Sequence, residues 1–177
     1  MRLRSLLILL GGLAIGLGLG VAVILGFDYS TNADNSNPTI GSVAPDFKLQ
    51  TLSEEEVRLN RFRGSPVLIN FWATWCQPCQ IEMPYIQNRF DRYSPDLVVL
   101  AVNFDEPVSS VQEFVEEQKL TIDVLLDPGG RVQELYQIRG YPTTYFVDAE
   151  GIIRVIHIGF MTEDQLDEYL TKVGVGG

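Results

Sequence analysis

The most informative part of the sequence is the stretch Asn70-Phe-Trp-Ala-Thr-Trp-Cys-Gln-Pro-Cys-Gln-Ile-Glu-Met-Pro84. It begins inside an apolar run, residues 66–71, that has the length of a central strand covered on both faces. It continues into residues 79–93, where apolar side chains recur every three or four positions, as on a helix. The stretch is therefore predicted to join a buried strand to a helix, with the chain's two cysteines, Cys76 and Cys79, at the junction.

Strand and helix patterns alternate after this stretch. Residues 97–102 form a second apolar run and residues 108–118 a second helical stripe, while residues 143–147 and 152–158 have the pattern of a hairpin. A last helix is predicted to follow Thr162, which begins a capping-box pattern. This order of elements predicts an α/β fold with a mixed central β-sheet flanked by helices.

The N-terminal end of the chain is apolar. Residues 6–27 carry no charge and would span about 33 Å as a helix at about 1.5 Å per residue, enough for the hydrocarbon core of a membrane. Arg2 and Arg4 precede this segment, so the N-terminus is predicted to stay in the cytoplasm and the rest of the chain to lie outside. The alternative is a cleaved signal peptide, for which only Thr31 and Ala33 offer a weak cleavage site.

These patterns divide the chain into four parts. Residues 1–27 are predicted to be a signal-anchor transmembrane helix, and residues 28–39, which contain almost nothing to bury, a flexible linker. Residues 40–173 are predicted to form one folded domain, and residues 174–177, which are Gly-Val-Gly-Gly, a disordered tail. A chain of 177 residues has room for one such domain with a sizeable core.

The part of the chain after residue 27 is strongly acidic, with 11 basic and 23 acidic residues once Arg2 and Arg4 are set aside. Such a surface repels phosphate backbones and anionic lipid headgroups, so no nucleic-acid partner is expected. Net acidity also serves simply to keep a domain soluble. The charge therefore excludes a class of partner without identifying one.

The spacing of the two cysteines suits reversible disulfide chemistry. Residues i and i+3 lie on one face of a helix about 5 to 6 Å apart, which is close enough to bridge. Pro78 fits the first helical turn, so Cys76 is predicted to lie at the helix N-terminus, where free N–H groups favour a thiolate. A thiolate attacks disulfides, whereas a thiol does not.

Three other interpretations of the cysteine pair are weaker. A structural disulfide across so short a loop would restrain the unfolded chain little. A zinc site needs four ligands, and beside the two cysteines the chain offers one histidine, His157, expected on an edge or at the surface. Two incidental free thiols would be unusual outside the cytoplasm. The sequence therefore predicts a redox-active pair, no metal site, and no cofactor beyond the disulfide itself.

The cysteine segment resembles the active-site segment of the TlpA/ResA-like thiol-disulfide oxidoreductases. These proteins form a membrane-anchored group of the thioredoxin-like superfamily with an AhpC/TSA-redoxin type domain. The resemblance runs from about Gly41-Ser-Val-Ala-Pro-Asp-Phe47 to the last helix, and includes Glu82, Pro84 and Gly140-Tyr-Pro-Thr-Thr-Tyr-Phe146 in order. It implies a thioredoxin-like fold and a single-pass protein of the bacterial cytoplasmic membrane whose enzymatic domain lies on the extracytoplasmic side.

The resemblance also implies a role for each residue of the site. Cys76 would be the exposed nucleophile and Cys79 the resolving thiol, with Glu82 either a proton relay that perturbs the thiols or simply a solvated helix residue. Pro142 would form a cis bond beside the cysteines, although only about 5 to 6% of X-Pro bonds are cis. Glu106 would be a second pocket carboxylate, unless it is merely exposed at a strand end. The predicted substrate contacts are Trp75, Gln77, Pro78, Glu106, Tyr141, Pro142 and Thr143.

More than one function fits this site. The leading prediction is a monomer that reduces substrate disulfides and is itself restored by a membrane thiol relay; in the family the substrate is often the haem-binding cysteine pair of apocytochrome c. An oxidant that installs disulfides is the alternative, because Gln77 and Pro78 tune the potential without revealing its value. A peroxiredoxin-type peroxidase would need Pro and Thr where Ile69 and Ala73 stand, and a copper metallochaperone would need CxxxC and a suitably placed histidine.

Overall fold

The structure is a computed structural model that describes residues 37–176. The predicted anchor, residues 1–27, and most of the predicted linker lie outside the described residues, so both stay predictions. Between residues 37 and 176, none of the helices combines the length and the apolar character that a membrane crossing requires.

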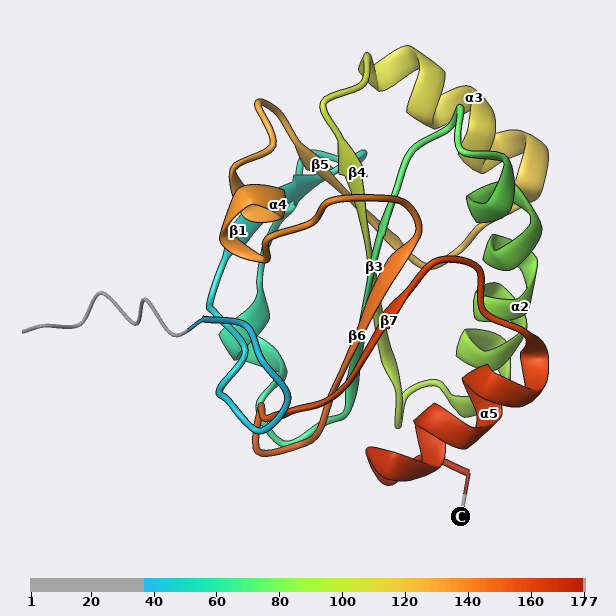
Figure 1. Cartoon of the computed structure of the whole chain (residues 1–177). Coiled ribbons are helices and arrows are strands. Elements are labelled where there is room, and N and C mark those ends of the chain that lie inside the picture. Colours follow the sequence, from blue (N-terminus) through green and yellow to red (C-terminus); the bar gives the residue numbers. More distant parts are fainter. Residues whose placement is uncertain (1–36, 177) are drawn as a thin grey trace, which may run out of the picture. The chain divides into compact units, whose positions relative to one another are not determined.

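Seven strands form one mixed sheet in the order β2-β1-β5-β4-β3-β6-β7 (Figure 1). The central strands β3, β4 and β5 run parallel, whereas β6 and β7 on one side and β1 and β2 on the other are antiparallel to their neighbours. In chain order the strands are β1 (Lys48–Thr51), β2 (Glu56–Arg58), β3 (Val67–Trp72), β4 (Val98–Phe104), β5 (Asp123–Asp127), β6 (Thr143–Val147) and β7 (Ile153–Ile158).

Helices cover both faces of the sheet. Helices α2, α3 and α5 lie on one face of the sheet and α4 on the other (Figure 1). Buried side chains of α2, α3 and α5 belong to one core cluster, and those of α4 and the short 3-10 helix η1 belong to the other. The helices are η1 (Leu59–Phe62), α2 (Gln77–Tyr93), α3 (Val108–Gln118), α4 (Arg131–Leu135) and α5 (Glu163–Lys172). The predicted α/β architecture with a mixed sheet is confirmed.

Strand β3 shows why its sequence is a continuous apolar run. Its side chains alternate between the two cores, with Leu68 and Trp72 in the cluster that includes α2 and with Ile69 and Phe71 in the opposite cluster. All of its residues are buried, because helices cover the sheet on both sides. The cysteine segment thus begins directly after a strand that lies in the middle of the core.

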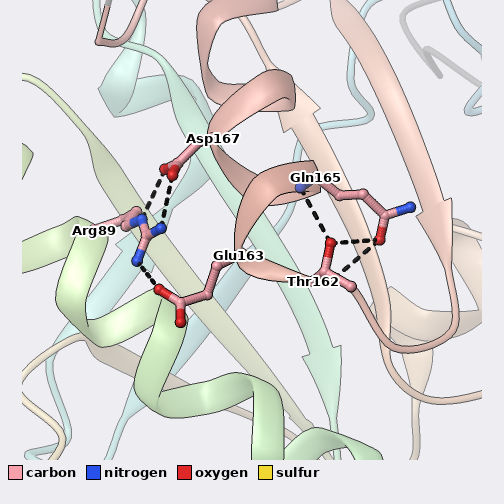
Figure 2. A network of polar contacts seen from close by, with 5 residues as sticks. All are labelled: Arg89, Thr162, Glu163, Gln165 and Asp167. Atoms are coloured by element: carbon pink, nitrogen blue, oxygen red, sulfur yellow. Dashed lines mark hydrogen bonds and ion pairs between the residues drawn. The ribbon is translucent and has the colours of Figure 1, made fainter.

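The helix that begins at Glu163 follows Thr162 as predicted. The Thr162 side chain accepts a hydrogen bond from the Gln165 amide, and the Gln165 side chain accepts one from the Thr162 amide, a capping box (Figure 2). Arg89 of α2 links that helix to α5. Its guanidinium donates to both carboxylate oxygens of Asp167, at 2.8 and 2.7 Å, and to Glu163 at 2.7 Å.

The prediction of a disordered tail from residue 174 is wrong as far as Val175. Gly174 has a φ of 89° and ends α5 in a Schellman turn, with its amide bonded to the Thr171 carbonyl at 3.2 Å and the Val175 amide to the Leu170 carbonyl at 3.0 Å. The Val175 side chain is buried beside Leu170 in the same core cluster. The packed domain also begins earlier than predicted, since Pro38 is already buried.

Candidate active site

The two cysteines form a disulfide at the start of α2. Cys76 is the N-cap of the helix and Cys79 lies in its first turn, with 5.3 Å between the two Cα atoms. The backbone N–H of Cys79 donates to the Cys76 sulfur at 3.2 Å. Pro78 occupies the first turn, where its missing N–H costs no helical hydrogen bond. The predicted position of Cys76 at a helix N-terminus is confirmed, and backbone dipole and N–H groups there stabilise a thiolate.

The cysteine pair is covered except where Cys76 reaches a groove of about 540 Å³. Cys79 is 1% exposed and Cys76 is 5% exposed, so an incoming disulfide meets Cys76 first. Trp75 stands 64% exposed beside the groove, with its ring edge-on to Tyr141 at 5.7 Å between centroids. The groove is lined by Trp75, Cys76, Gln77, Pro78, Ile138, Arg139, Gly140 and Tyr141, four of which belong to the predicted substrate contacts.

The segment after Gly140 supplies the other side of the site. The Tyr141–Pro142 bond is cis, as the resemblance implied. Pro142 is buried and its carbonyl accepts the Gly159 amide at 2.8 Å, while the buried Thr143 donates its hydroxyl to the Gly140 carbonyl at 2.8 Å. Neither Pro142 nor Thr143 is among the residues that line the groove, so their predicted contact with substrate stays a prediction.

Glu82 lies inside the protein, three positions after Cys79 on α2, and not at its surface. Its side chain is buried at 1% exposure, and its carboxylate accepts hydrogen bonds from the Met161 amide at 2.7 Å and from the Asn70 side chain at 3.1 Å. Burial raises the pKa of Glu82 to about 7, and the two donors only partly offset that effect. A carboxyl with this pKa can hold or release a proton near neutrality.

Sequence reasoning missed the partner of Glu82. Asn70 is buried on β3 and donates from one side-chain nitrogen to Glu82 and, at 2.9 Å, to the hydroxyl of Thr144 on β6. Its carbonyl oxygen has no hydrogen-bond partner within residues 37–176. The signal for this role was present, because Asn70 is a polar residue inside the otherwise apolar run of residues 66–71.

Glu106 is half-buried after β4 and does not line the Cys76 groove. Its carboxylate accepts hydrogen bonds from the amide and the hydroxyl of Thr74 and, at 2.7 Å, from the side chain of Asn103. It also borders a separate cavity of about 480 Å³ between β1, β5 and the start of α3. Its predicted contact with substrate stays a prediction, and neither Thr74 nor Asn103 was anticipated from the sequence.

The described part of the chain contains no group of three or more His, Cys, Asp or Glu side chains arranged to hold a metal ion. The single histidine, His157, lies on the edge strand β7, and its Nε2 contacts the Phe160 carbonyl at 3.1 Å.

Comparison with known proteins assigns this site to a family. The AhpC/TSA family matches residues 40–156. The chain is 39% identical over 160 residues to the thiol-disulfide oxidoreductase ResA of Oceanobacillus iheyensis, an alignment that covers 88% of this chain and 83% of that protein. The chain belongs to the AhpC/TSA family and is a ResA-type thiol-disulfide oxidoreductase.

A further relative and a solved structure are also similar to this chain. The thioredoxin-like protein YneN of Bacillus subtilis is 42% identical over 133 residues, which cover 73% of this chain and 78% of YneN. A crystal structure described as a thiol:disulfide interchange protein DsbE, from Chlorobium tepidum, superposes with a TM-score of 0.71 at 31% identity, over 77% of this chain and 99% of that one. The predicted thioredoxin-like fold of the ResA-type domain is confirmed.

Proposed function

We propose that this ResA-type oxidoreductase works outside the cytoplasm as a reductant of protein disulfides, tethered to the membrane through residues 1–27. The observation that carries the direction of electron flow is the buried carboxyl of Glu82 on the same face of α2 as Cys79. A carboxylate close to a thiol raises the pKa of that thiol and destabilises its thiolate. The thiolate belongs to the reduced form of the enzyme. An enzyme whose reduced form is stabilised acts as an oxidant, so an enzyme whose reduced form is destabilised acts as a reductant.

The reaction proceeds in two exchanges. The Cys76 thiolate attacks one sulfur of a substrate disulfide, forms a mixed disulfide and releases the other substrate sulfur as a thiolate, which takes up a proton. Cys79 then loses its proton and attacks the Cys76 sulfur, which regenerates the Cys76–Cys79 disulfide and releases the second substrate thiol. Two electrons and two protons have passed to the substrate, and an external dithiol must return them to the enzyme.

The groove supports a protein substrate. It is bordered by the exposed ring of Trp75 and by Tyr141, so a chain carrying a disulfide can lie against Cys76 while Cys79 stays covered. The haem-binding cysteine pair of apocytochrome c is the candidate substrate, and a membrane-embedded thiol relay is the candidate electron donor. No further cofactor or second subunit enters this mechanism.

The reduction potential tests the direction. The detergent-solubilised full chain is equilibrated with glutathione buffers, and the fraction of oxidised Cys76–Cys79 is read by gel shift after alkylation. A potential near about −270 mV, as in thioredoxin, supports the reductant, whereas one near about −120 mV, as in DsbA, overturns it in favour of a disulfide-installing oxidant.

The substrate is tested by trapping. Cys79→Ala leaves Cys76 without its resolving partner, so mixed disulfides with substrates accumulate. Recovery of cytochrome c apoproteins from the membrane fraction supports the candidate substrate, and recovery of other disulfide proteins replaces it. A Cys76→Ala variant, which lacks the nucleophile, is the matched control and should trap nothing.

The location is tested separately. Alkaline phosphatase, which folds only where disulfides form, is fused after residue 177. Activity of the fusion supports an extracytoplasmic domain, and an inactive but stable fusion contradicts it. Sedimentation of the full chain with membranes after alkaline washing distinguishes an uncleaved anchor from a processed signal peptide.

A further inference from the structure

Thr74 lies two residues before Cys76, and each of its polar groups is held by a different bond. Its amide donates to Glu106 Oε2 at 2.7 Å, and its hydroxyl donates to Glu106 Oε1. Its carbonyl accepts from the side chain of Gln80, on the first turns of α2, at 2.7 Å. Thr74 is therefore bonded both to the end of β4, through Glu106, and to α2, through Gln80.

Glu106 is itself fixed to the sheet. The side-chain nitrogen of Asn103 donates to Glu106 Oε2 at 2.7 Å, and Asn103 is buried at 1% exposure. Asn103 lies on β4 opposite Trp72, the last residue of β3. The path from the core sheet to Thr74 thus runs through two side chains, Asn103 and Glu106, that are hydrogen-bonded to each other.

The supported turn sets the geometry of the nucleophile. The Cys76 amide donates to the Ala73 carbonyl at 3.2 Å, which closes a turn that contains Thr74 and Trp75. Cys76 then has φ −82° and ψ 100°, the extended conformation of an N-cap, and its sulfur accepts the Cys79 amide. In the reduced enzyme the same N–H can donate to the Cys76 thiolate and stabilise it, which requires the sulfur to stay in place over the first turn of α2.

We propose that Thr74 is a positioning residue for the disulfide exchange, held by Glu106, Asn103 and Gln80 so that the Cys76 sulfur stays over the N-terminus of α2. Thr74 does not line the groove, so it acts through Cys76 and not through substrate. The proposal rests on the proposed function only in taking Cys76 as the attacking thiol. It is independent of the direction of electron flow.

The test replaces the hydroxyl without changing size or charge. Thr74→Val is nearly isosteric and removes the hydroxyl bond to Glu106, and Thr74→Ser restores it. Thr171→Val removes a threonine hydroxyl bond on the exposed end of α5, to the Glu168 carbonyl, and controls for the substitution itself. The charged or titratable groups around the cysteines are the same in every variant. They are Glu82 on α2, Glu106 bonded to Thr74, and Arg139 and Tyr141 in the groove.

Two quantities are measured on the reduced, detergent-solubilised full chain: the pH profile of Cys76 alkylation by iodoacetamide, assigned by peptide mapping, and the reduction potential against glutathione. For Thr74→Val we expect alkylation about fivefold slower at a pH below the midpoint, from a weakened hydrogen bond to the thiolate. The midpoint of the alkylation pH profile should move to higher pH, because the Cys76 thiolate is less stable. The reduction potential of the Cys76–Cys79 pair should become more negative for the same reason. Thr74→Ser should return both quantities to the parent values.

The proposal is overturned if Thr74→Val keeps the parent midpoint and potential, even where its melting temperature falls, because Thr74 would then only support the fold. Should Thr74→Val not fold, Gln80→Met removes the bond to the Thr74 carbonyl from the exposed side, and an unchanged midpoint in that variant also overturns it. A parent potential near that of an oxidant would reject the proposed direction while leaving the difference between the Thr74 variants interpretable.

Discussion

The Met161 amide donates a 2.7 Å hydrogen bond to the carboxylate of Glu82, although 79 positions separate the two residues in the chain. Met161 lies in the connection between β7 and α5, and its side chain is buried in the core that also contains Cys79. The carboxyl three positions after Cys79 is thus bound to the segment that leads into the last helix. Protonation of Glu82 and the packing of that segment are consequently coupled.

The stability of the enzyme should depend on pH through Glu82. Burial raises the pKa of Glu82 to about 7, so its contribution to the free energy of unfolding is full below about pH 4.5 and is lost as the pH rises through 7. The complete loss amounts to about 3 kcal/mol. Glu82→Gln cannot ionise, so its free energy of unfolding should fall less between pH 5 and pH 8. Urea unfolding at both values measures this.

Glu150→Gln, at an exposed position, is the matched control and should behave as the parent. An equal fall in Glu82→Gln and the parent would contradict the role of Glu82 in this pH dependence. Glu82→Gln should also shift the pH profile of Cys76 alkylation. An unchanged profile removes Glu82 from the mechanism, whatever its effect on stability.

Loss of the Asn70 side chain should both destabilise the fold and perturb Glu82. Asn70→Ala leaves buried oxygens of Glu82 and Thr144 without their donor, at a cost of about 1 to 3 kcal/mol in free energy of unfolding. Because the Asn70 hydrogen bond lowers the pKa of Glu82, its removal should raise that pKa further. Carboxyl NMR titration checks the direction, with exposed Asn60→Ala as control. A fall in the Glu82 pKa is the outcome against this prediction.

Truncation of Trp75 should affect turnover and spare stability. Its ring is 64% exposed at the groove, so Trp75→Ala should change the free energy of unfolding by no more than about 0.5 kcal/mol. Loss of the aromatic surface should reduce kcat/KM for a disulfide-bonded peptide about tenfold. Ile81→Ala, at a 49% exposed position of α2 away from the groove, is the control. Equal turnover by both variants would show that Trp75 does not contact substrate.

The ion pairs between α2 and α5 should contribute modestly and in a salt-dependent way. Arg89 is 11% exposed and binds Asp167 with two nitrogens and Glu163 with a third (Figure 2). Arg89→Lys loses the two-pronged geometry and should lower the free energy of unfolding by about 1 kcal/mol. The difference from the parent should shrink in about 1 M salt, where charges are screened. Reduction of peptide disulfides should be unchanged, because Arg89 lies outside the groove.

Local patterns predicted some elements well and others not at all. The predicted helix over residues 108–118 coincides with α3, and β3 and β4 lie within two residues of the two apolar runs. Strands β1, β2 and β5 and helix α4 were not predicted. β1 and β2 are short and mostly polar or half-exposed, so their own residues give little strand pattern. They pair with each other as a local hairpin, and β1 joins the sheet by pairing with β5, which lies about 75 residues further along the chain.

The residues of the site also differ in whether local sequence could predict their roles. Cys76, Pro78 and Cys79 lie within one helical turn, where spacing and the absent N–H of proline act on near neighbours. The roles of Glu82 and Glu106 instead depend on bonds to Met161 and Thr74, and no local pattern contains them.

Local sequence accounts for the strand-to-helix junction, the placement of the cysteine pair at a helix N-terminus and the redox chemistry that follows, because these depend on residues a few positions apart. The folded structure was needed to show that Glu82 is buried with a raised pKa. It was also needed to show that Glu106 accepts hydrogen bonds from Thr74 and is not simply exposed at a strand end. Burial and hydrogen-bond partners come from elements that meet only in the folded chain, so the environment of the thiols is a property of the fold.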